Sequence, residues 1–295
     1  MSLSRRELLW KLGAGGAAAA SIATYSREDL VALGLEQQRG GPRPAGGADV
    51  IKLSNNENLR GPGPKVIEAL KNHNFSNLGL GYAPPHLSAF VDACAAMDGA
   101  KPQNVILATG SGEILTGAVM AYCNGDKALV TGERSYGSPA QTAQRMKAPV
   151  KFIAVNPKTL ALDLEGMIRA SVGAGLVFLC NPNNPTSTVQ TSADVEQTVR
   201  TIKQRSPETG ILIDEAYLEY ATKPGVFTMA KLALELPGVF ISRTFSKAYG
   251  MAGMRIGYAI GQTDTVKPLA RLRMPYGISV FGVAAGIAAL NDPKH

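Results

Sequence analysis

The chain has little cysteine and little histidine for its length. Of its 295 residues, 3 are cysteine and 3 are histidine. Cys94, Cys123 and Cys180 are odd in number and lie in apolar surroundings, which favours buried thiols over a disulfide framework. His73 and His86 have no neighbouring ligand at the spacing of a metal site. The sequence therefore predicts neither a disulfide scaffold nor a metal centre.

Internal repeats, clustered charge and long apolar runs are also missing from the body of the chain. No segment beyond the N-terminal stretch has the length of a membrane helix. The formal net charge of +7 comes partly from N-terminal arginines, and the other basic residues are not grouped as in a nucleic-acid footprint. With 45% hydrophobic residues, the chain can bury a large core. The composition is that of a globular protein without a nucleic-acid or membrane partner.

Residues 1–25 have the pattern of a twin-arginine export signal. Arg5 and Arg6 precede a short, alanine-rich apolar stretch with small residues at its end. Residues 26–48 follow as a linker, because their glycine and proline content gives them no core of their own. We therefore expect an exported or periplasmic protein that folds before export. A disordered basic start on a cytoplasmic protein is the alternative.

From about residue 49 onward, apolar runs typical of strands alternate with segments of helical spacing, such as 194–205. This alternation predicts an α/β fold. The expected strands are residues 105–108, 128–131, 150–155, 176–180, 211–214 and 239–242.

Asp214 closes one of these apolar runs, so its carboxylate is expected at the carboxyl end of a strand, where open α/β sheets bind ligands. If the ligand contains a pyridine ring, a carboxylate at this position can keep the ring nitrogen protonated. The phenol of Tyr217 can hydrogen-bond to an oxygen at position 3 of the same ring. A helix N-cap is the alternative role for Asp214.

Two further turns come directly after expected strands. Residues 181–186 read Asn-Pro-Asn-Asn-Pro-Thr, which by themselves indicate only a turn. Ser111, Gly112 and Glu113 stand between a strand and a helical segment. The free amides at such a helix start surround an anion, and phosphate is the natural ligand.

Lys247 carries the most chemical information. Residues 242–255 read Ser-Arg-Thr-Phe-Ser-Lys-Ala-Tyr-Gly-Met-Ala-Gly-Met-Arg, which presents the lysine among hydroxyls and glycines, eight residues before Arg255. This arrangement suits a Schiff base beside a bound phosphate and so indicates pyridoxal phosphate chemistry. A solvated turn is the alternative.

Taken in order, these motifs resemble the fold type I pyridoxal phosphate aminotransferases of class I/II, and most closely the histidinol-phosphate aminotransferase family. The match also includes residues 55–58, Asn-Asn-Glu-Asn, followed by Gly61 and Pro62. The resemblance implies a mostly parallel sheet with helices on both faces, in a cofactor-binding large domain of residues 76–295. Residues 49–75 are then the N-terminal arm of a small domain, and the protein is a homodimer.

The resemblance also implies a role for each site residue. Lys247 forms the Schiff base and then moves a proton between the substrate Cα and the cofactor, while Asp214 pairs with the pyridine nitrogen. Asn184 and Tyr217 bond to the 3-oxygen. Tyr136 stacks on the ring, with ordinary packing as the alternative. The residues expected at the cofactor phosphate are Ser111, Gly112, Glu113, Thr244, Ser246, Arg255 and, from a neighbouring subunit, Tyr82, for which ordinary packing is again the alternative.

The chain departs from the family pattern at two motifs. Where the family has Asn-Pro-x-Gly-Pro, this chain has Asn58, Leu59 and Arg60 before Gly-Pro. Asn58 and Arg60 are the candidate substrate residues, and the arginine either favours an acidic substrate or points into water. Ser187 replaces the usual glycine after Asn-Pro-Thr, which the turn accommodates if the backbone keeps a negative φ.

The family continues beyond the equivalent of His295 into a small C-terminal domain that carries the arginine for the substrate carboxylate. No arginine of this chain replaces it by motif. We therefore expect the N-terminal part of a longer enzyme, or the product of a truncated gene, without that domain.

The leading hypothesis is an aminotransferase that moves an amino group between an amino acid or amino phosphate and a 2-oxo acid. The resemblance favours histidinol phosphate with 2-oxoglutarate, whereas export favours an aromatic or other donor, because histidine synthesis is cytoplasmic. The alternatives are a decarboxylase of the same fold, related to threonine-phosphate decarboxylase, and a non-catalytic remnant.

Overall fold

The computed structural model describes residues 55–79, 82 and 84–292. The expected export signal, the linker and the first residues of the N-terminal arm lie outside these residues. The described part contains every site residue that the sequence predicts.

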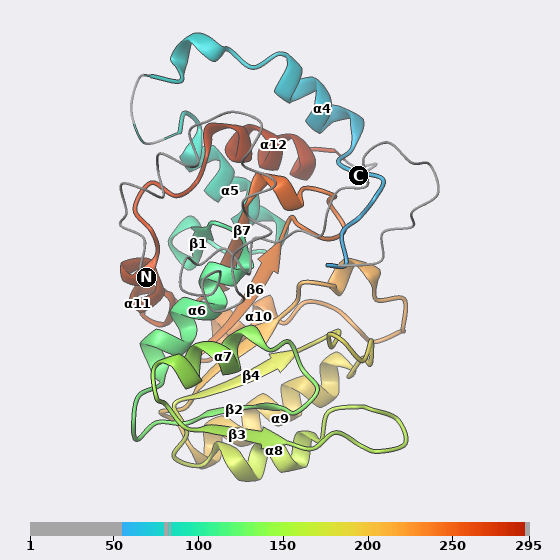
Figure 1. Ribbon diagram of the computed structural model, residues 1–295, viewed down its shortest axis with the longest axis vertical. Coiled ribbons are helices and arrows are strands. Elements are labelled where there is room, and N and C mark those ends of the chain that lie inside the picture. Colours follow the sequence, from blue (N-terminus) through green and yellow to red (C-terminus); the bar gives the residue numbers. More distant parts are fainter. Residues whose placement is uncertain (1–54, 80–81, 83, 293–295) are drawn as a thin grey trace, which may run out of the picture. The chain divides into compact units, whose positions relative to one another are not determined.

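Seven strands form one sheet in the order β1-β7-β6-β5-β4-β2-β3 (Figure 1). Strands β2 to β6 pair in parallel, whereas β7 is antiparallel to both of its neighbours, β1 and β6. The predicted α/β fold with a mostly parallel sheet is confirmed, and each predicted strand is present. The strands are β1 Val105–Ala108, β2 Leu129–Gly132, β3 Val150–Ile153, β4 Leu176–Cys180, β5 Gly210–Asp214, β6 Val239–Thr244 and β7 Gly257–Gly261.

Strand β7 is the one that the sequence analysis missed. The strand has a glycine at each end, Gly257 and Gly261, and glycine is depleted in strands. Its sequence therefore does not have the pattern expected of a strand. Close packing explains both glycines: a Cβ on Gly257 would lie 2.6 Å from the amide nitrogen of Ser111, and one on Gly261 would lie 3.0 Å from the Phe240 Cβ. Gly257 thus lets the start of a helix at Ser111 approach the sheet.

Helices cover both faces of the sheet (Figure 1). Because side chains alternate along a strand, Leu212 and Ile213 enter different cores, one on each face. Each fully buried side chain of this size contributes about 1.5–3 kcal/mol to folding. The Leu212 core is closed by α6 Ser111–Tyr122, α7 Ser138–Arg145 and α11 Thr263–Leu272. The Ile213 core is closed by α4 Pro64–Lys71, α5 Leu87–Met97, α8 Leu164–Ser171, α9 Ser192–Arg205, α10 Ala230–Glu235 and α12 Val280–Leu290.

Short helices and caps complete the connections. The helix expected over 194–205 begins two residues earlier, because Thr191 is its N-cap and its hydroxyl accepts a hydrogen bond from the Asp194 amide at 3.1 Å. The 3₁₀ turns are η2 Phe75–Asn77, η3 Pro102–Asn104, η4 Leu218–Tyr220 and η5 Ala252–Met254.

Cys94, Cys123 and Cys180 are free and buried, as their apolar surroundings predict. Among the described residues, no helix combines the length and the hydropathy needed to cross a membrane. The same residues contain no group of three or more His, Cys, Asp or Glu side chains placed to hold a metal ion.

Candidate active site

Most of the predicted site residues meet at the carboxyl edge of the parallel strands. Asp214 ends β5 and pairs in register with Cys180, which ends β4, and with Ser242 of β6. The loops after β4, β5 and β6 carry Asn184, Tyr217 and Lys247, respectively. The edge therefore collects side chains from well-separated parts of the sequence.

Asp214 is a buried carboxylate, 3% exposed, held by its neighbours in the sheet. The Ser242 hydroxyl donates to Oδ1 at 2.7 Å, and Sγ of Cys180 lies 4.0 Å from Oδ2. Burial raises the pKa of Asp214 to about 6, against the opposing effects of the Ser242 hydroxyl, the Ala216 amide and the Lys247 charge. At neutral pH the group is therefore mostly ionised and directed at any cation that binds here.

Lys247 follows the end of β6, and its amine faces the other site groups. Its Nζ donates to the carbonyl of Asn55 at 2.7 Å and lies 5.6 Å from the centroid of the Tyr217 ring. Burial lowers the pKa of Lys247, while the negative charges of Glu57 and Asp214 raise it. A lowered pKa increases the share of neutral amine, which is the nucleophilic form.

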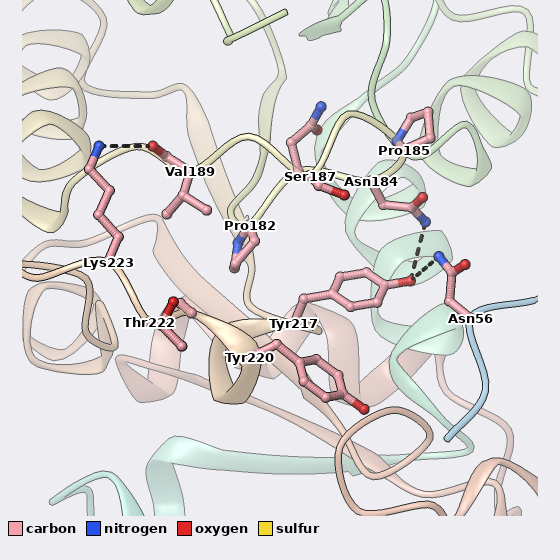
Figure 2. A pocket seen from close by; sticks show the side chains of 12 residues that line it. Asn56, Pro182, Asn184, Pro185, Ser187, Val189, Tyr217, Tyr220, Thr222 and Lys223 are labelled. Atoms are coloured by element: carbon pink, nitrogen blue, oxygen red, sulfur yellow. Dashed lines mark hydrogen bonds between the residues drawn. The ribbon is translucent and has the colours of Figure 1, made fainter. Parts of the chain in front are cut away.

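The Tyr217 hydroxyl accepts two amide hydrogen bonds, from Asn184 at 3.3 Å and from Asn56 at 3.1 Å (Figure 2). Burial raises its pKa. The structure thus brings together Asn184 and Tyr217, the pair expected at the 3-oxygen of a pyridine ring. A cavity of about 540 Å³ opens beside them, bordered by Asn56, Ser187, Tyr220, Thr222 and Lys223.

The start of helix α6 and the Arg255 guanidinium form a cradle for an anion. The first amides of a helix have no partner within the helix, and here they belong to Ser111 and Gly112. Arg255 donates to the Ser246 hydroxyl at 3.4 Å and to the Thr109 carbonyl at 3.5 Å.

Two further hydroxyls belong to the segments that form this cradle. Thr244 ends β6, and its Oγ1 accepts a hydrogen bond from the Ser246 amide at 3.1 Å. Thr109 Oγ1 is buried and has no hydrogen-bond partner among the described residues. Amides, hydroxyls and a guanidinium around one point are the donor set that a phosphate requires, so the residues present fit the phosphate of pyridoxal phosphate.

Glu113 supports the cradle instead of offering a free amide. Its amide donates to the Gly110 carbonyl at 3.2 Å. Its carboxylate accepts from the amides of Thr109 and Met274, each at 2.6 Å. This arrangement is close to a capping box, in which the third residue of a helix reaches back to the preceding loop.

The two candidate tyrosines differ in position. Burial raises the pKa of Tyr136, and the charges of Asp214 and Arg255 also act on it, which places this phenol at the site. Tyr82 is 81% exposed, and its ring lies 5.2 Å from that of Tyr276. Its proposed contact with a neighbouring subunit stays a prediction.

The candidate substrate residues lie apart from each other. Asn58 donates to the Ala248 carbonyl at 2.9 Å, which attaches the N-terminal arm to the Lys247 loop. Arg60 is exposed and borders a groove along α4, not the Lys247 cluster. The substrate roles of both residues stay predictions.

The expected negative φ at Ser187 is wrong. Its φ is +58°, in the left-handed region that favours glycine. Its amide donates to the Asn183 carbonyl at 2.8 Å, and this turn holds the residue in that conformation. The serine therefore adopts a backbone conformation that a glycine would adopt more readily.

Sequence reasoning missed several residues that contact the site: Asn55, Asn56, Thr109, Cys180 and Ser242. Cys180 and Ser242 had a usable signal, because each stands near the end of a strand expected in the same sheet as Asp214. No sequence signal indicated the contacts that Asn55 and Asn56 make, because these contacts depend on the path of the N-terminal arm.

A lysine amine, a buried carboxylate, an amide–phenol pair and an anion cradle at this edge define the class of fold type I pyridoxal phosphate-dependent enzymes. The family model for aminotransferase class I and II matches residues 48–295. The chain belongs to this family of pyridoxal phosphate-dependent transaminases.

Individual relatives agree with this assignment. The chain is 32% identical to the histidinol-phosphate aminotransferase of Lactiplantibacillus plantarum over 250 residues, which are 83% of this chain and 68% of that protein. It is 34% identical to that of Moorella thermoacetica over 255 residues, 86% of this chain and 64% of the relative. The chain therefore spans about two thirds of the length of these relatives.

Solved structures show the same fold. Histidinol-phosphate aminotransferase from Sinorhizobium meliloti, in complex with pyridoxal-5'-phosphate, superimposes with a TM-score of 0.72 at 30% identity, covering 81% of this chain and 63% of that one. L-threonine-O-3-phosphate decarboxylase from Porphyromonas gingivalis has a TM-score of 0.65 at 19% identity, covering 79% of this chain and 70% of that one. The latter likeness shows the fold alone.

Proposed function

We propose that the chain transfers an amino group between an amino donor, of the histidinol phosphate or aromatic kind, and a 2-oxo acid. The observation that carries the proposal is the convergence of Lys247, Asp214 and Tyr217 beside the Arg255 cradle. Pyridoxal phosphate, when bound, supplies an aldehyde for the amine and a pyridinium ring that withdraws electrons from the substrate Cα.

The residues of the chain then have distinct tasks. The amine of Lys247 would bind the cofactor aldehyde and, once the amino donor has replaced it there, would move a proton at the substrate Cα. Burial lowers the pKa of this amine, which favours the neutral form that both tasks need. Asp214 keeps the pyridine nitrogen protonated, while Asn184 and Tyr217 hold the 3-oxygen. Arg255, with the hydroxyls and helix amides, binds the phosphate and so fixes the ring.

The cavity beside Tyr217 provides room for the donor. Its border is mostly uncharged and polar, with the aromatic ring of Tyr220 and the single cation Lys223 among its lining residues (Figure 2). Aromatic and amide groups suit a flat, polar side chain such as an imidazole or a phenol. We propose that the donor side chain binds here.

The proposed function is tested with the purified protein and added pyridoxal phosphate. We expect a visible absorption band, reduction of the bound cofactor onto the protein by borohydride, and formation of glutamate from 2-oxoglutarate with histidinol phosphate or phenylalanine. Release of carbon dioxide from O-phosphothreonine without glutamate would favour the decarboxylase. Cofactor binding without either product would favour the non-catalytic remnant.

Gly110→Ala is expected to weaken the binding of pyridoxal phosphate about tenfold or more. Gly110 has a φ of +78°, and a Cβ there would lie 2.5 Å from a terminal nitrogen of Arg255. The guanidinium must move away, and a charge-assisted hydrogen bond to phosphate is worth about 1.5–3 kcal/mol. The affinity is measured by titrating the apoprotein.

Gly173→Ala is the matched control for Gly110→Ala. Gly173 has a φ of +70°, but its Cβ would meet no atom within 4 Å. This control should lose stability from backbone strain while keeping the wild-type affinity. Equal affinities for all three proteins would contradict the assignment of Arg255 to the phosphate.

Export and dimerisation stay predictions. The signal in residues 1–25 lies outside the described residues, and the contact of Tyr82 with a second subunit requires a second chain. We propose an exported homodimer. A fusion of residues 1–48 to a reporter and the mass of the protein in solution test the two parts separately.

A further inference from the structure

Ser242 is a buried hydroxyl that the roles above leave unassigned. It is 0% exposed, and it lies on β6 directly opposite Asp214 in the parallel register of β5 and β6. Side chains alternate along β6, so Ser242 shares with Asp214 the face of the sheet covered by α6, while Arg243 points to the other face. Its hydroxyl donates to Asp214 Oδ1 at 2.7 Å.

The other carboxylate oxygen has a different neighbour. Sγ of Cys180 lies 4.0 Å from Oδ2 and 3.4 Å from the Pro182 carbonyl. A thiol is a weak donor, and burial keeps the pKa of Cys180 above its ordinary value, so the group is neutral. Of the two side chains that flank Asp214 in the sheet, only Ser242 is a strong donor at hydrogen-bond distance.

We propose that Ser242 is a positioning residue for the Asp214 carboxylate, which it holds ionised and aimed at the ring nitrogen of the cofactor. The proposal rests on the proposed function, since it assigns the partner of Asp214. It adds a residue whose effect on the cofactor is exerted through Asp214.

The other titratable groups around Asp214 do not duplicate this role. Lys247, after β6, lowers the pKa of Asp214 through its charge, but its amine is committed to the cofactor aldehyde. Tyr136, after β2, and Tyr217, after β5, are coupled to Asp214 with raised pKa values and stay neutral. The positive charge of Arg255, in the phosphate cradle, lowers the pKa of Tyr136 and the pKa of Lys247. Ser242 is the side-chain hydrogen bond that lowers the pKa of Asp214 most.

The hydrogen bond should be visible in the pH dependence of cofactor binding. A pyridinium favours the ionised carboxylate, so the pKa of Asp214 is lower in the complex than in the free protein, where it is about 6. Affinity is then complete above the free-protein pKa and falls as the pH drops through it. Without the Ser242 hydroxyl the free-protein pKa is higher, so the fall begins at higher pH.

The test measures the affinity of the apoprotein for pyridoxal phosphate from pH 5 to 9, a range that includes the free-protein pKa of Asp214 and its expected value in the variant. For Ser242→Ala we expect the midpoint of the fall to move up by about one to two pH units and the affinity at neutral pH to drop about two- to tenfold. The pH dependence of the visible band of the bound cofactor should move in the same direction. Ser242→Thr, which keeps the hydroxyl, should restore both.

Three controls separate this result from other causes. Ser171→Ala removes a different buried hydroxyl, which donates to the Ile168 carbonyl at 2.8 Å, and should leave the midpoint unchanged. Asp214→Asn should abolish the fall in cofactor affinity whose midpoint Ser242→Ala moves. Only the titration of the phosphate group of pyridoxal phosphate should then remain. If Ser242→Ala does not fold, Ser242→Cys keeps the volume with a weak donor and should give a smaller shift of the same sign.

The outcomes distinguish this inference from the proposed function. If the wild-type protein does not bind pyridoxal phosphate at any pH, the proposed function fails. If the wild-type protein binds it and Ser242→Ala has the wild-type midpoint, the positioning role of Ser242 is wrong while the proposed function stands.

Discussion

Lys247→Ala is expected to abolish amino transfer and the covalent attachment of the cofactor. The Lys247 amine faces the Tyr217 ring at 5.6 Å, and burial lowers its pKa. Loss of a positioned proton-transfer group alone slows a reaction by about 10²- to 10⁴-fold. The variant should still bind pyridoxal phosphate, because the Arg255 cradle is intact and the Ser242 hydroxyl still favours the ionised form of Asp214. Transfer rates and the mass of the protein after borohydride treatment check both parts.

Lys231→Ala is the control for this substitution. Lys231 is exposed on α10 and contributes nothing to the site edge, so the variant should keep the wild-type rate and the wild-type mass shift. Transfer by Lys247→Ala at the wild-type rate would remove Lys247 from the mechanism. Reduction of the cofactor onto Lys247→Ala would show that another amine carries it.

The sheet could be predicted wherever strands are continuous apolar runs. β4 and β5 are buried on both faces and contain almost only apolar residues, which is a strong local signal. β7 carries a glycine at each end because Ser111 and Phe240 approach its backbone closely. That requirement arises from tertiary packing, so no local pattern could have predicted it.

The residues of the site also fall into those that a local pattern predicts and those that depend on tertiary packing. Asp214, Tyr217 and Lys247 could be predicted because each belongs to a motif in one short stretch of sequence. Asn58 was expected at the substrate, but its side chain donates to the Ala248 carbonyl, a contact set by the path of the N-terminal arm. Such long-range pairings leave no trace in spacing or composition.

A buried ion cluster on the opposite face of the sheet supports the same edge. Arg243, whose side chain is 8% exposed, lies 3.2 Å from Glu215 and 3.6 Å from both Asp98 and Glu219. Asp98 also accepts a hydrogen bond from the Tyr258 hydroxyl at 2.9 Å. Glu215 and Arg243 each follow, in sequence, a residue of the Asp214–Ser242 pair, so the cluster and the site share one backbone.

Arg243→Met is expected to destabilise the protein by about 3–5 kcal/mol, the usual cost of removing one partner from a buried ion pair. Burial already raises the pKa of Glu215 to about 7, and Arg243 is the main group that opposes this. Without the arginine, the buried carboxylates have no cation to balance them. Urea denaturation at pH 7.5 and 5.5, on either side of the wild-type pKa of Glu215, measures the loss.

The pH dependence of this loss has a definite sign. A carboxyl group whose pKa is raised by folding stabilises the folded state while it is protonated. This contribution to the free energy of unfolding is fully present below the pKa of the unfolded state, and it is lost as the pH rises through the pKa of the folded state. Arg243→Met raises the folded pKa of Glu215 further, so the variant should lose less stability at pH 5.5 than at pH 7.5. Arg200→Met is the control, because Arg200 pairs with Glu196 and Glu235 at 2.8 Å on the surface, where ion pairs contribute little. An equal loss for the two variants would mean that the Arg243 cluster behaves like a surface pair and does not hold the edge that carries Asp214.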